Sequence, residues 1–190
     1  MPLPPVIVVS GLPRSGTSLM MQMLVAAGLP ALTDGARAAD ADNPRGYFEY
    51  EPAKSLGRDA TWLARAGGKA VKVVSALLPH LPVGHSYRIV FMRRPLAAIL
   101  ASQREMLVRR GHPVPTPDED ERMAMLFARH LADTVERLER DAKTSVLYVD
   151  YPELVRAPFE VASRVAAFLD ADLDVSRMAG VVDPALQRQR

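Results

Sequence analysis

Short apolar runs alternate with longer segments of helical periodicity along the chain. The runs at 6–9, 70–74, 87–92 and 145–149 are rich in β-branched residues, which is typical of strands buried on both faces. Between them, helices are predicted over 19–27, 52–66, 95–110, 118–140 and 158–169, followed by a short helical tail. This alternation predicts a three-layer α/β fold, with a central, mostly parallel sheet and helices on both faces.

Chain length and continuity predict a single domain over residues 1–190. There is no internal repeat and no shift in composition that would mark a boundary. Residues 29–50 form a long loop without sustained periodicity, and long loops in compact domains are often functional. On the helix at 118–140 we expect a packing stripe made of Leu126, Leu131, Val135 and Leu138.

Composition narrows the function classes. The 24 basic and 22 acidic residues leave a net charge of +2, and aromatic residues make up 6%, so no nucleic-acid-binding stripe is predicted. The chain has no cysteine, which excludes disulfides and thiolate metal sites, and its four histidines lack metal-ligand spacing. No apolar segment reaches the ~20 residues of a membrane span, and no signal peptide is recognisable, so we expect a cytoplasmic protein.

The glycine loop after the first strand is the strongest chemical signal. A strand, a glycine loop and a helix in succession aim backbone amides and the helix dipole at an anion. Gly11 and Gly16 have the spacing of a Walker A loop, yet Thr17 stands where that loop has lysine. A cation is present inside the loop at Arg14, and Ser18 supplies a hydroxyl. These features predict a P-loop fold with an altered phosphate site.

The missing lysine affects the chemistry that the loop can support. A nucleotide hydrolase needs that ammonium group and a magnesium ion held partly by a strand-borne aspartate. Here the later strands end at Ser75 and Arg93. The loop therefore predicts a donor with one phosphate-like group at its 5′ end that reacts without a metal. A glycine turn that binds no ligand is the simpler alternative.

Three segments resemble the sulfotransferases that use 3′-phosphoadenosine 5′-phosphosulfate (PAPS). The first is the loop itself, which resembles the family's 5′-phosphosulfate loop. The resemblance implies that its arginine contacts the bridging and sulfonate oxygens, and that its Thr/Ser pair contacts the 5′-phosphate. The cofactor-binding residues implied here are Pro13, Arg14, Ser15, Gly16, Thr17 and Ser18.

The second segment, residues 91–102, resembles the family's 3′-phosphate motif. Arg94 and Ser102 have the family's eight-residue separation, just over two helical turns. The third, residues 148–155, resembles a Tyr-Glu-Asp-Leu segment and implies that Tyr151 lies near the adenine, although Pro152 and Glu153 depart from the pattern. The alternatives are a solvated arginine, a helix-surface serine and a packed tyrosine.

The resemblance implies in-line transfer of a sulfuryl group from PAPS to a hydroxyl or amine, leaving adenosine 3′,5′-bisphosphate. The acceptor then needs a general base. In the long loop Glu49 is our first candidate, followed by Asp34 and then Glu51. His80 and His85 are weaker candidates, since neither directly follows the second strand, where cytosolic family members carry their histidine.

Two further cations are candidates for the site. Lys72, a charge in an apolar strand, is either solvated at the strand's end or reaches the sulfonate. The basic tail, with Arg188, either closes over the 3′-phosphate or is solvated.

The sequence leaves the identity of the acceptor open among small molecules, glycans and lipids. It also leaves monomer and homodimer open. Two other functions compete with sulfuryl transfer: a P-loop small-molecule or nucleotide kinase, and a non-catalytic phosphonucleotide-binding module.

Overall fold

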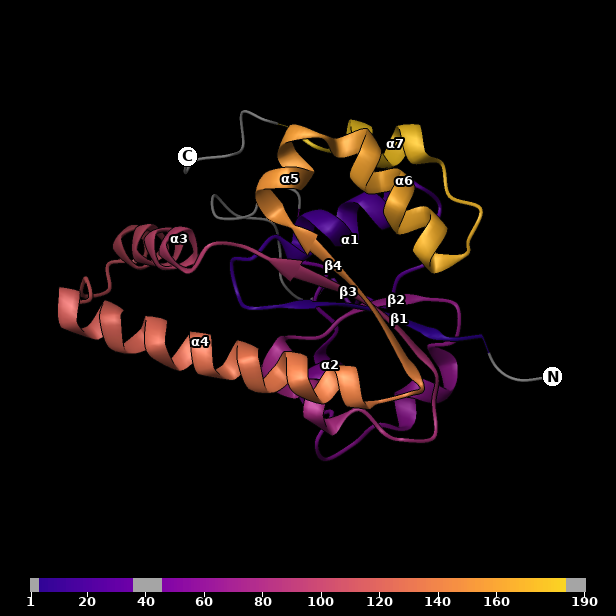
Figure 1. Ribbon diagram of the computed structural model, residues 1–190, viewed down its shortest axis with the longest axis horizontal. Coiled ribbons are helices and arrows are strands. Elements are labelled where there is room, and N and C mark those ends of the chain that lie inside the picture. Colours follow the sequence, from indigo (N-terminus) through magenta and orange to yellow (C-terminus); the bar gives the residue numbers. More distant parts are fainter. Residues whose placement is uncertain (1–3, 36–45, 184–190) are drawn as a thin grey trace.

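The sheet lies at the centre of the molecule. The computed structural model describes residues 4–35 and 46–183 (Figure 1). Within them, the strands form one parallel sheet in the order β2-β1-β3-β4. The strands are β1 (Val6–Gly11), β2 (Ala70–Lys72), β3 (Tyr87–Arg93) and β4 (Thr144–Asp150). The predicted α/β fold with a parallel sheet is confirmed.

Helices cover both faces of this sheet, as predicted (Figure 1). The longer helices are α1 (Thr17–Ala26), α3 (Leu96–Arg109), α4 (Pro117–Arg140) and α6 (Pro158–Leu169). The shorter ones are α2 (Glu51–Lys54), α5 (Tyr151–Arg156), α7 (Val175–Gly180) and the 3₁₀ helices η1 (Thr61–Arg65) and η2 (Ser75–His80).

Alternate residues of the central strand β1 face two separate cores. Ile7 and Val9 pack with α1, α6 and α7, whereas Val6 and Val8 pack with η1 and the C-terminal end of α4. All four side chains are buried because side chains alternate between the faces of a strand and both faces are covered. This explains why the strand reads as a continuous apolar run.

The helix predicted over 52–66 is wrong in its continuity. The chain forms two short elements there, α2 and η1, with Gly57 between them. The Asp59 carboxylate accepts hydrogen bonds from the amide of Thr61 at 2.9 Å and from its hydroxyl at 2.7 Å. Such a local side-chain bond competes with helix continuation. Trp62 and Leu63 are nevertheless buried anchors, as expected.

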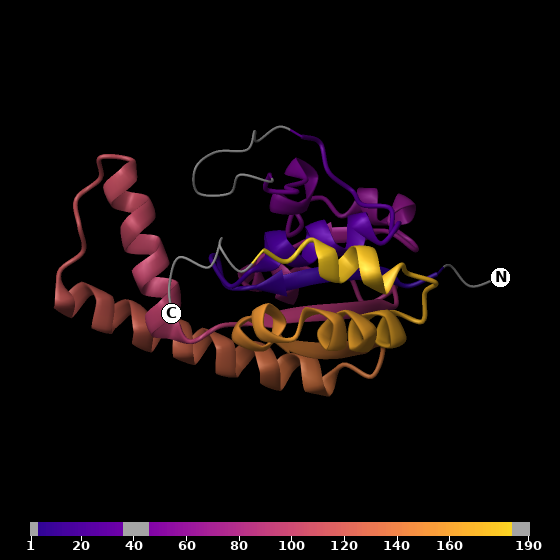
Figure 2. The ribbon, with the colours of Figure 1, turned by 90° about the horizontal axis from the view of Figure 1, so that it is seen from above.

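Helix α3 and the N-terminal half of α4 form an arm that extends beyond the end of the sheet (Figures 1 and 2). A capping box between Thr116 and Glu119 begins α4. The predicted packing stripe holds for Leu138, which is buried, but not for Leu126, whose exposed fraction is 62%. Leu126 lies on the part of α4 that passes beyond the sheet, so it has no core to enter. No helix in the described ranges is long and apolar enough to cross a membrane.

Candidate functional site

A cavity of about 590 Å³ opens at the carboxyl ends of the strands. Its lining comes from the glycine loop, the segment around Tyr47, the end of β2, one face of α3, and α5. Ligands of open α/β sheets bind at this edge, next to the strand where the connections diverge. Here that strand is β1, which lies between β2 and β3.

The glycine loop is shaped by two glycines with positive φ. Gly11 has φ 146°, and a Cβ there would lie 2.5 Å from the Ser15 hydroxyl and 2.7 Å from the Met92 carbonyl oxygen. Gly16 has φ 103°, and a Cβ there would lie 2.5 Å from the Tyr151 ring. Both positions exclude a side chain, which lets the backbone approach a ligand closely.

The amides that face the cavity begin after Ser15. The Ser15 amide donates to the Leu12 carbonyl at 3.1 Å, so it is used inside the loop. The Ser15 hydroxyl is buried, with no hydrogen-bond partner in the described parts of the chain. Helix α1 begins at Thr17, and the first amides of a helix have no acceptor within it. An anion would therefore meet Gly16, Thr17 and Ser18, while Pro13 and Arg14 flank it.

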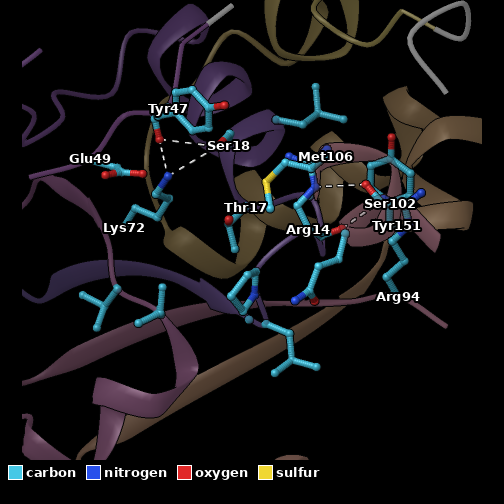
Figure 3. A pocket seen from close by; sticks show the side chains of 18 of the residues that line it. Arg14, Thr17, Ser18, Tyr47, Glu49, Lys72, Arg94, Ser102, Met106 and Tyr151 are labelled. Atoms are coloured by element: carbon cyan, nitrogen blue, oxygen red, sulfur yellow. Dashed lines mark hydrogen bonds between the residues drawn. The ribbon is translucent and has the colours of Figure 1, made fainter. Parts of the chain in front are cut away.

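Arg94, Ser102 and Tyr151 lie together at one end of the cavity (Figure 3). Arg94 donates to the Arg14 carbonyl at 2.9 Å, and its guanidinium carbon lies 4.5 Å from the centre of the Tyr151 ring. Burial lowers the pKa of Arg94 from its ordinary value, and Arg14 nearby adds to this effect. Arg94 is thus half-buried and Ser102 is buried, so neither is a solvated surface residue.

Arg14 points toward the Ser102 end. Its Nε donates to the Ser102 hydroxyl at 2.9 Å, and its φ of 70° is unusual for a residue other than glycine. The family resemblance implies a contact with the sulfonate instead. In this structure the guanidinium lies at the end where the 3′-phosphate is expected (Figure 3).

Lys72 reaches into the opposite end of the cavity. Its ammonium donates to the carbonyl of Tyr47 and to the hydroxyl of Ser18, the latter at 3.4 Å. The Lys72 side chain lines the cavity (Figure 3), and its contact with a sulfonate stays a prediction. A cation from β2 thus lies beside the glycine loop, which lacks the Walker lysine.

Among the three candidate carboxylates, only Glu49 lines the cavity. Its Oε2 lies 2.9 Å from the Lys54 ammonium, and 18% of its side chain is exposed. Asp34 lies outside the lining, where its carboxylate accepts from the Glu51 amide at the start of α2. Glu51 also lies outside and pairs with Lys54 at 2.8 Å.

The weaker candidates are not brought to the cavity. His80 lies beside Gly57, and His85 packs near the Tyr87 ring, with 6.2 Å between ring centres. Arg188 lies outside the described residues.

Several residues that line the cavity carry no sequence motif. Met106 and Arg109 follow Ser102 by four and seven positions on α3, so the three share one helix face. Arg110 and, from α4, Phe127 complete this wall. The helical spacing from Ser102 could have indicated from the sequence that Met106 and Arg109 line the same site. No local pattern could indicate Phe127, because its position depends on how the arm folds.

Comparison with known proteins shows the fold. No protein-family model and no curated protein sequence matches the chain. Solved sulfotransferase structures match over most of its length. The sulfotransferase domain of the Synechococcus olefin synthase aligns with a TM-score of 0.56 and 19% identity, covering 100% of this chain and 85% of that one.

Two further sulfotransferases align similarly. STF1 from Mycobacterium tuberculosis gives a TM-score of 0.59 at 17% identity, over 93% of this chain and 70% of that one. The enzyme from Alicyclobacillus acidocaldarius gives 0.51 at 18% identity, over 90% and 85%. Sulfotransferases predominate among the structures that this chain resembles. The chain has the P-loop fold of the sulfotransferases.

Proposed function

We propose that this protein transfers a sulfuryl group from PAPS to a hydroxyl or amine of an acceptor, without a metal ion. The observation that carries the proposal is a pair of cations. Arg14 and Arg94 lie partly buried in the cavity, and neither forms an ion pair with a carboxylate in residues 4–35 and 46–183. Partly buried cations without a neutralising opposite charge are costly, so these two favour an anionic ligand.

A nucleotide with a phosphate at each end of its ribose suits the two ends of this cavity. Arg94 and Ser102 would hold the 3′-phosphate, with the Tyr151 ring beside them as a surface for the adenosine. The amides and hydroxyls of Thr17 and Ser18 would hold the 5′-phosphate at the start of α1. The glycine at position 16 keeps the backbone clear for this approach.

The reaction is a displacement at sulfur. The acceptor oxygen or nitrogen forms a bond to sulfur, the bond from sulfur to the 5′-phosphate oxygen breaks, and the acceptor's proton passes to Glu49. Lys72 would face the negative charge that develops on the sulfuryl oxygens, because it lies beside Ser18 at this end of the cavity. For Arg14 to assist at the bridging oxygen, its side chain would have to leave Ser102.

Isothermal titration with adenosine 3′,5′-bisphosphate tests the nucleotide assignment. We expect binding that does not require Mg²⁺ and is weakened about tenfold or more by Arg94→Ala, since hydrogen bonds to charged groups contribute about 1.5–3 kcal/mol. Arg93→Ala is the matched control, because Arg93 lies outside the cavity lining and stacks on Tyr148 at 3.7 Å.

Titration with ADP separates the competing functions. Magnesium-dependent ADP binding that exceeds bisphosphate binding would contradict the proposal and favour a kinase. Tight bisphosphate binding without sulfuryl transfer to any of a broad set of hydroxyl and amine acceptors would favour the non-catalytic module.

A further inference from the structure

The side chain of Arg14 lies at the end of the cavity where the 3′-phosphate is expected. Its Nε donates to the hydroxyl of Ser102, a buried residue of α3 that is distant from Arg14 in the sequence. Burial lowers the pKa of Arg94, and the charge of Arg14 also lowers it, so the two guanidinium groups lie within range of each other. Two like charges brought together beside a buried hydroxyl favour an anion between them.

The backbone of the glycine loop holds Arg14 in this direction. Arg14 has φ 70°, a left-handed conformation that is unfavourable for a residue other than glycine. Arg94 donates from Nη1 to the Arg14 carbonyl at 2.9 Å, and the amide of Ser15 donates to the Leu12 carbonyl at 3.1 Å. Both polar groups of the peptide that joins Arg14 to Ser15 are therefore hydrogen-bonded. Backbone strain of this kind persists where the surroundings fix it, and it is concentrated at ligand sites.

More hydrogen-bond donors than acceptors are present at this end. A guanidinium has five N–H groups. Arg14 uses its Nε–H on Ser102, and Arg94 uses Nη1 on the Arg14 carbonyl, but their remaining N–H groups have no acceptor in the described parts of the chain. The hydroxyl of Ser102 accepts from Arg14, and its own proton likewise has no acceptor there. A ligand that supplies several acceptor oxygens would use these donors.

The carboxylates of the cavity do not pair with these arginines. In the described ranges, the carboxylates that line the cavity are those of Glu49, Glu105 and Asp183. None of them forms an ion pair with Arg14 or Arg94, and the carboxylate of Glu105 lies 3.7 Å from Arg109 instead. A phosphate group suits this end, because arginine binds phosphate oxygens through paired hydrogen bonds.

A different cation serves the end where the sulfuryl group is expected. The ammonium of Lys72 donates to the Ser18 hydroxyl at 3.4 Å. Figure 3 shows Arg14 and Lys72 on opposite sides of Thr17. Lys72 can therefore face the sulfuryl oxygens while Arg14 stays with Ser102.

We infer that Arg14 binds the 3′-phosphate together with Arg94 and Ser102, and that these three residues select a donor with a 3′-phosphate. The inference rests on the proposed function. It departs from the family resemblance, which implies that the loop arginine contacts the bridging and sulfonate oxygens. The two arginines direct their remaining N–H groups at the phosphate oxygens, and Ser102 donates its hydroxyl proton.

Two nucleotides that each carry one of the two groups test the inference. Adenosine 3′,5′-bisphosphate has the 3′-phosphate and no sulfuryl group, whereas adenosine 5′-phosphosulfate has the sulfuryl group and no 3′-phosphate. Each is titrated calorimetrically into the protein without Mg²⁺. We expect Arg14→Ala to weaken binding of the bisphosphate about tenfold, because charge-assisted hydrogen bonds are lost, and to change binding of the phosphosulfate less than about twofold.

Three further variants make the result specific. Lys72→Met should give the opposite pattern, with severalfold weaker binding of the phosphosulfate and little change for the bisphosphate. Arg93→Ala is the matched control and should change neither, since Arg93 stacks on Tyr148 outside the cavity lining. Arg14→Gly should reproduce Arg14→Ala. Glycine adopts φ 70° readily, so this variant removes the side chain while the loop keeps its conformation.

The outcomes separate this inference from the proposed function. Equal weakening of both nucleotides, weakening of the phosphosulfate alone, or unchanged bisphosphate binding in both Arg14 variants overturns the inference and leaves the proposed function standing. If the unaltered protein does not bind the bisphosphate, the proposed function fails, and the inference fails with it.

Discussion

Gly16→Ala probes the contact between the glycine loop and Tyr151. The new methyl group would lie 2.5 Å from one ring carbon of Tyr151 and 3.1 Å from another, so the ring must move. The residue also has φ 103°, a conformation that costs an L-residue about 1–2 kcal/mol. Displacing the ring adds an overpacking cost of about 1–3 kcal/mol. It also disturbs the stacking of Arg94, which lies 4.5 Å from the ring centre.

Gly28→Ala separates the two costs. Gly28 has φ 95°, and a Cβ there would meet nothing within 4 Å, so only the backbone cost applies. By urea unfolding we expect Gly28→Ala to lower the free energy of unfolding by about 1–2 kcal/mol. Gly16→Ala should lower it by a further ~1–3 kcal/mol. Equal losses in the two variants would refute the argument that Tyr151 closes on the loop.

A double-mutant cycle tests whether the extra cost of Gly16→Ala comes from contact with the Tyr151 ring. In a Tyr151→Ala background the methyl group at position 16 has room, so the extra cost of Gly16→Ala should shrink toward that of Gly28→Ala. Bisphosphate binding provides a second measurement. Gly16→Ala should weaken it, because the loop backbone and Tyr151 both line the cavity, whereas Gly28→Ala should leave it unchanged.

Three further predictions concern catalysis and pH. Glu49→Gln should lower kcat by about 10²–10⁴, as loss of a general base does, whereas Glu51→Gln, which also removes a Lys54 partner but lies outside the cavity, should not. Lys72→Met should lower the transfer rate while calorimetric binding of the bisphosphate changes little, since the product lacks the sulfuryl group; strong loss of bisphosphate binding would contradict this role. Burial raises the pKa of Tyr87 from 10.0 to about 12, with Asp141 adding to the effect. Its contribution to stability is therefore complete below pH 10 and lost as the pH rises toward 12, so Tyr87→Phe should lose stability less steeply in this range when unfolding by denaturant is followed.

Local patterns in the sequence account for most of the sheet and for the end of the cavity at which Arg94 and Ser102 lie. The continuous apolar runs indicated the four strands of the sheet in the described residues. The signal is clearest for β1, which is buried on both faces and therefore has no polar positions on either face. The separation of Arg94 and Ser102 placed them on one side because helix geometry is regular over two turns. The glycine loop could be recognised from the sequence because a positive φ favours glycine over other residues.

The end of the cavity at which Lys72 and Glu49 lie depends on contacts between segments that are distant in the sequence. Lys72 on β2 meets Tyr47 and Ser18 only because β2 pairs with β1, and its own strand gives no sign of which way the ammonium turns. Glu49 lines the cavity and Asp34 does not, although the Asp34 amide donates to the Glu49 carbonyl at 3.3 Å, because the Asp34 carboxylate accepts from the Glu51 amide at the start of α2.

The position of the arm, formed by α3 and the N-terminal half of α4, likewise could not be predicted from local sequence patterns. Periodicity identified α4 but placed Leu126 in a packing stripe, because periodicity records which residues share a face and not where that face ends. Only the folded arrangement shows that α3 and α4 run past the sheet and bring Phe127, Met106 and Arg109 to the cavity. Strand identity and loop chemistry are set by neighbours in the chain, whereas the cavity wall that includes Met106 and Phe127 is assembled by packing between elements far apart in the sequence.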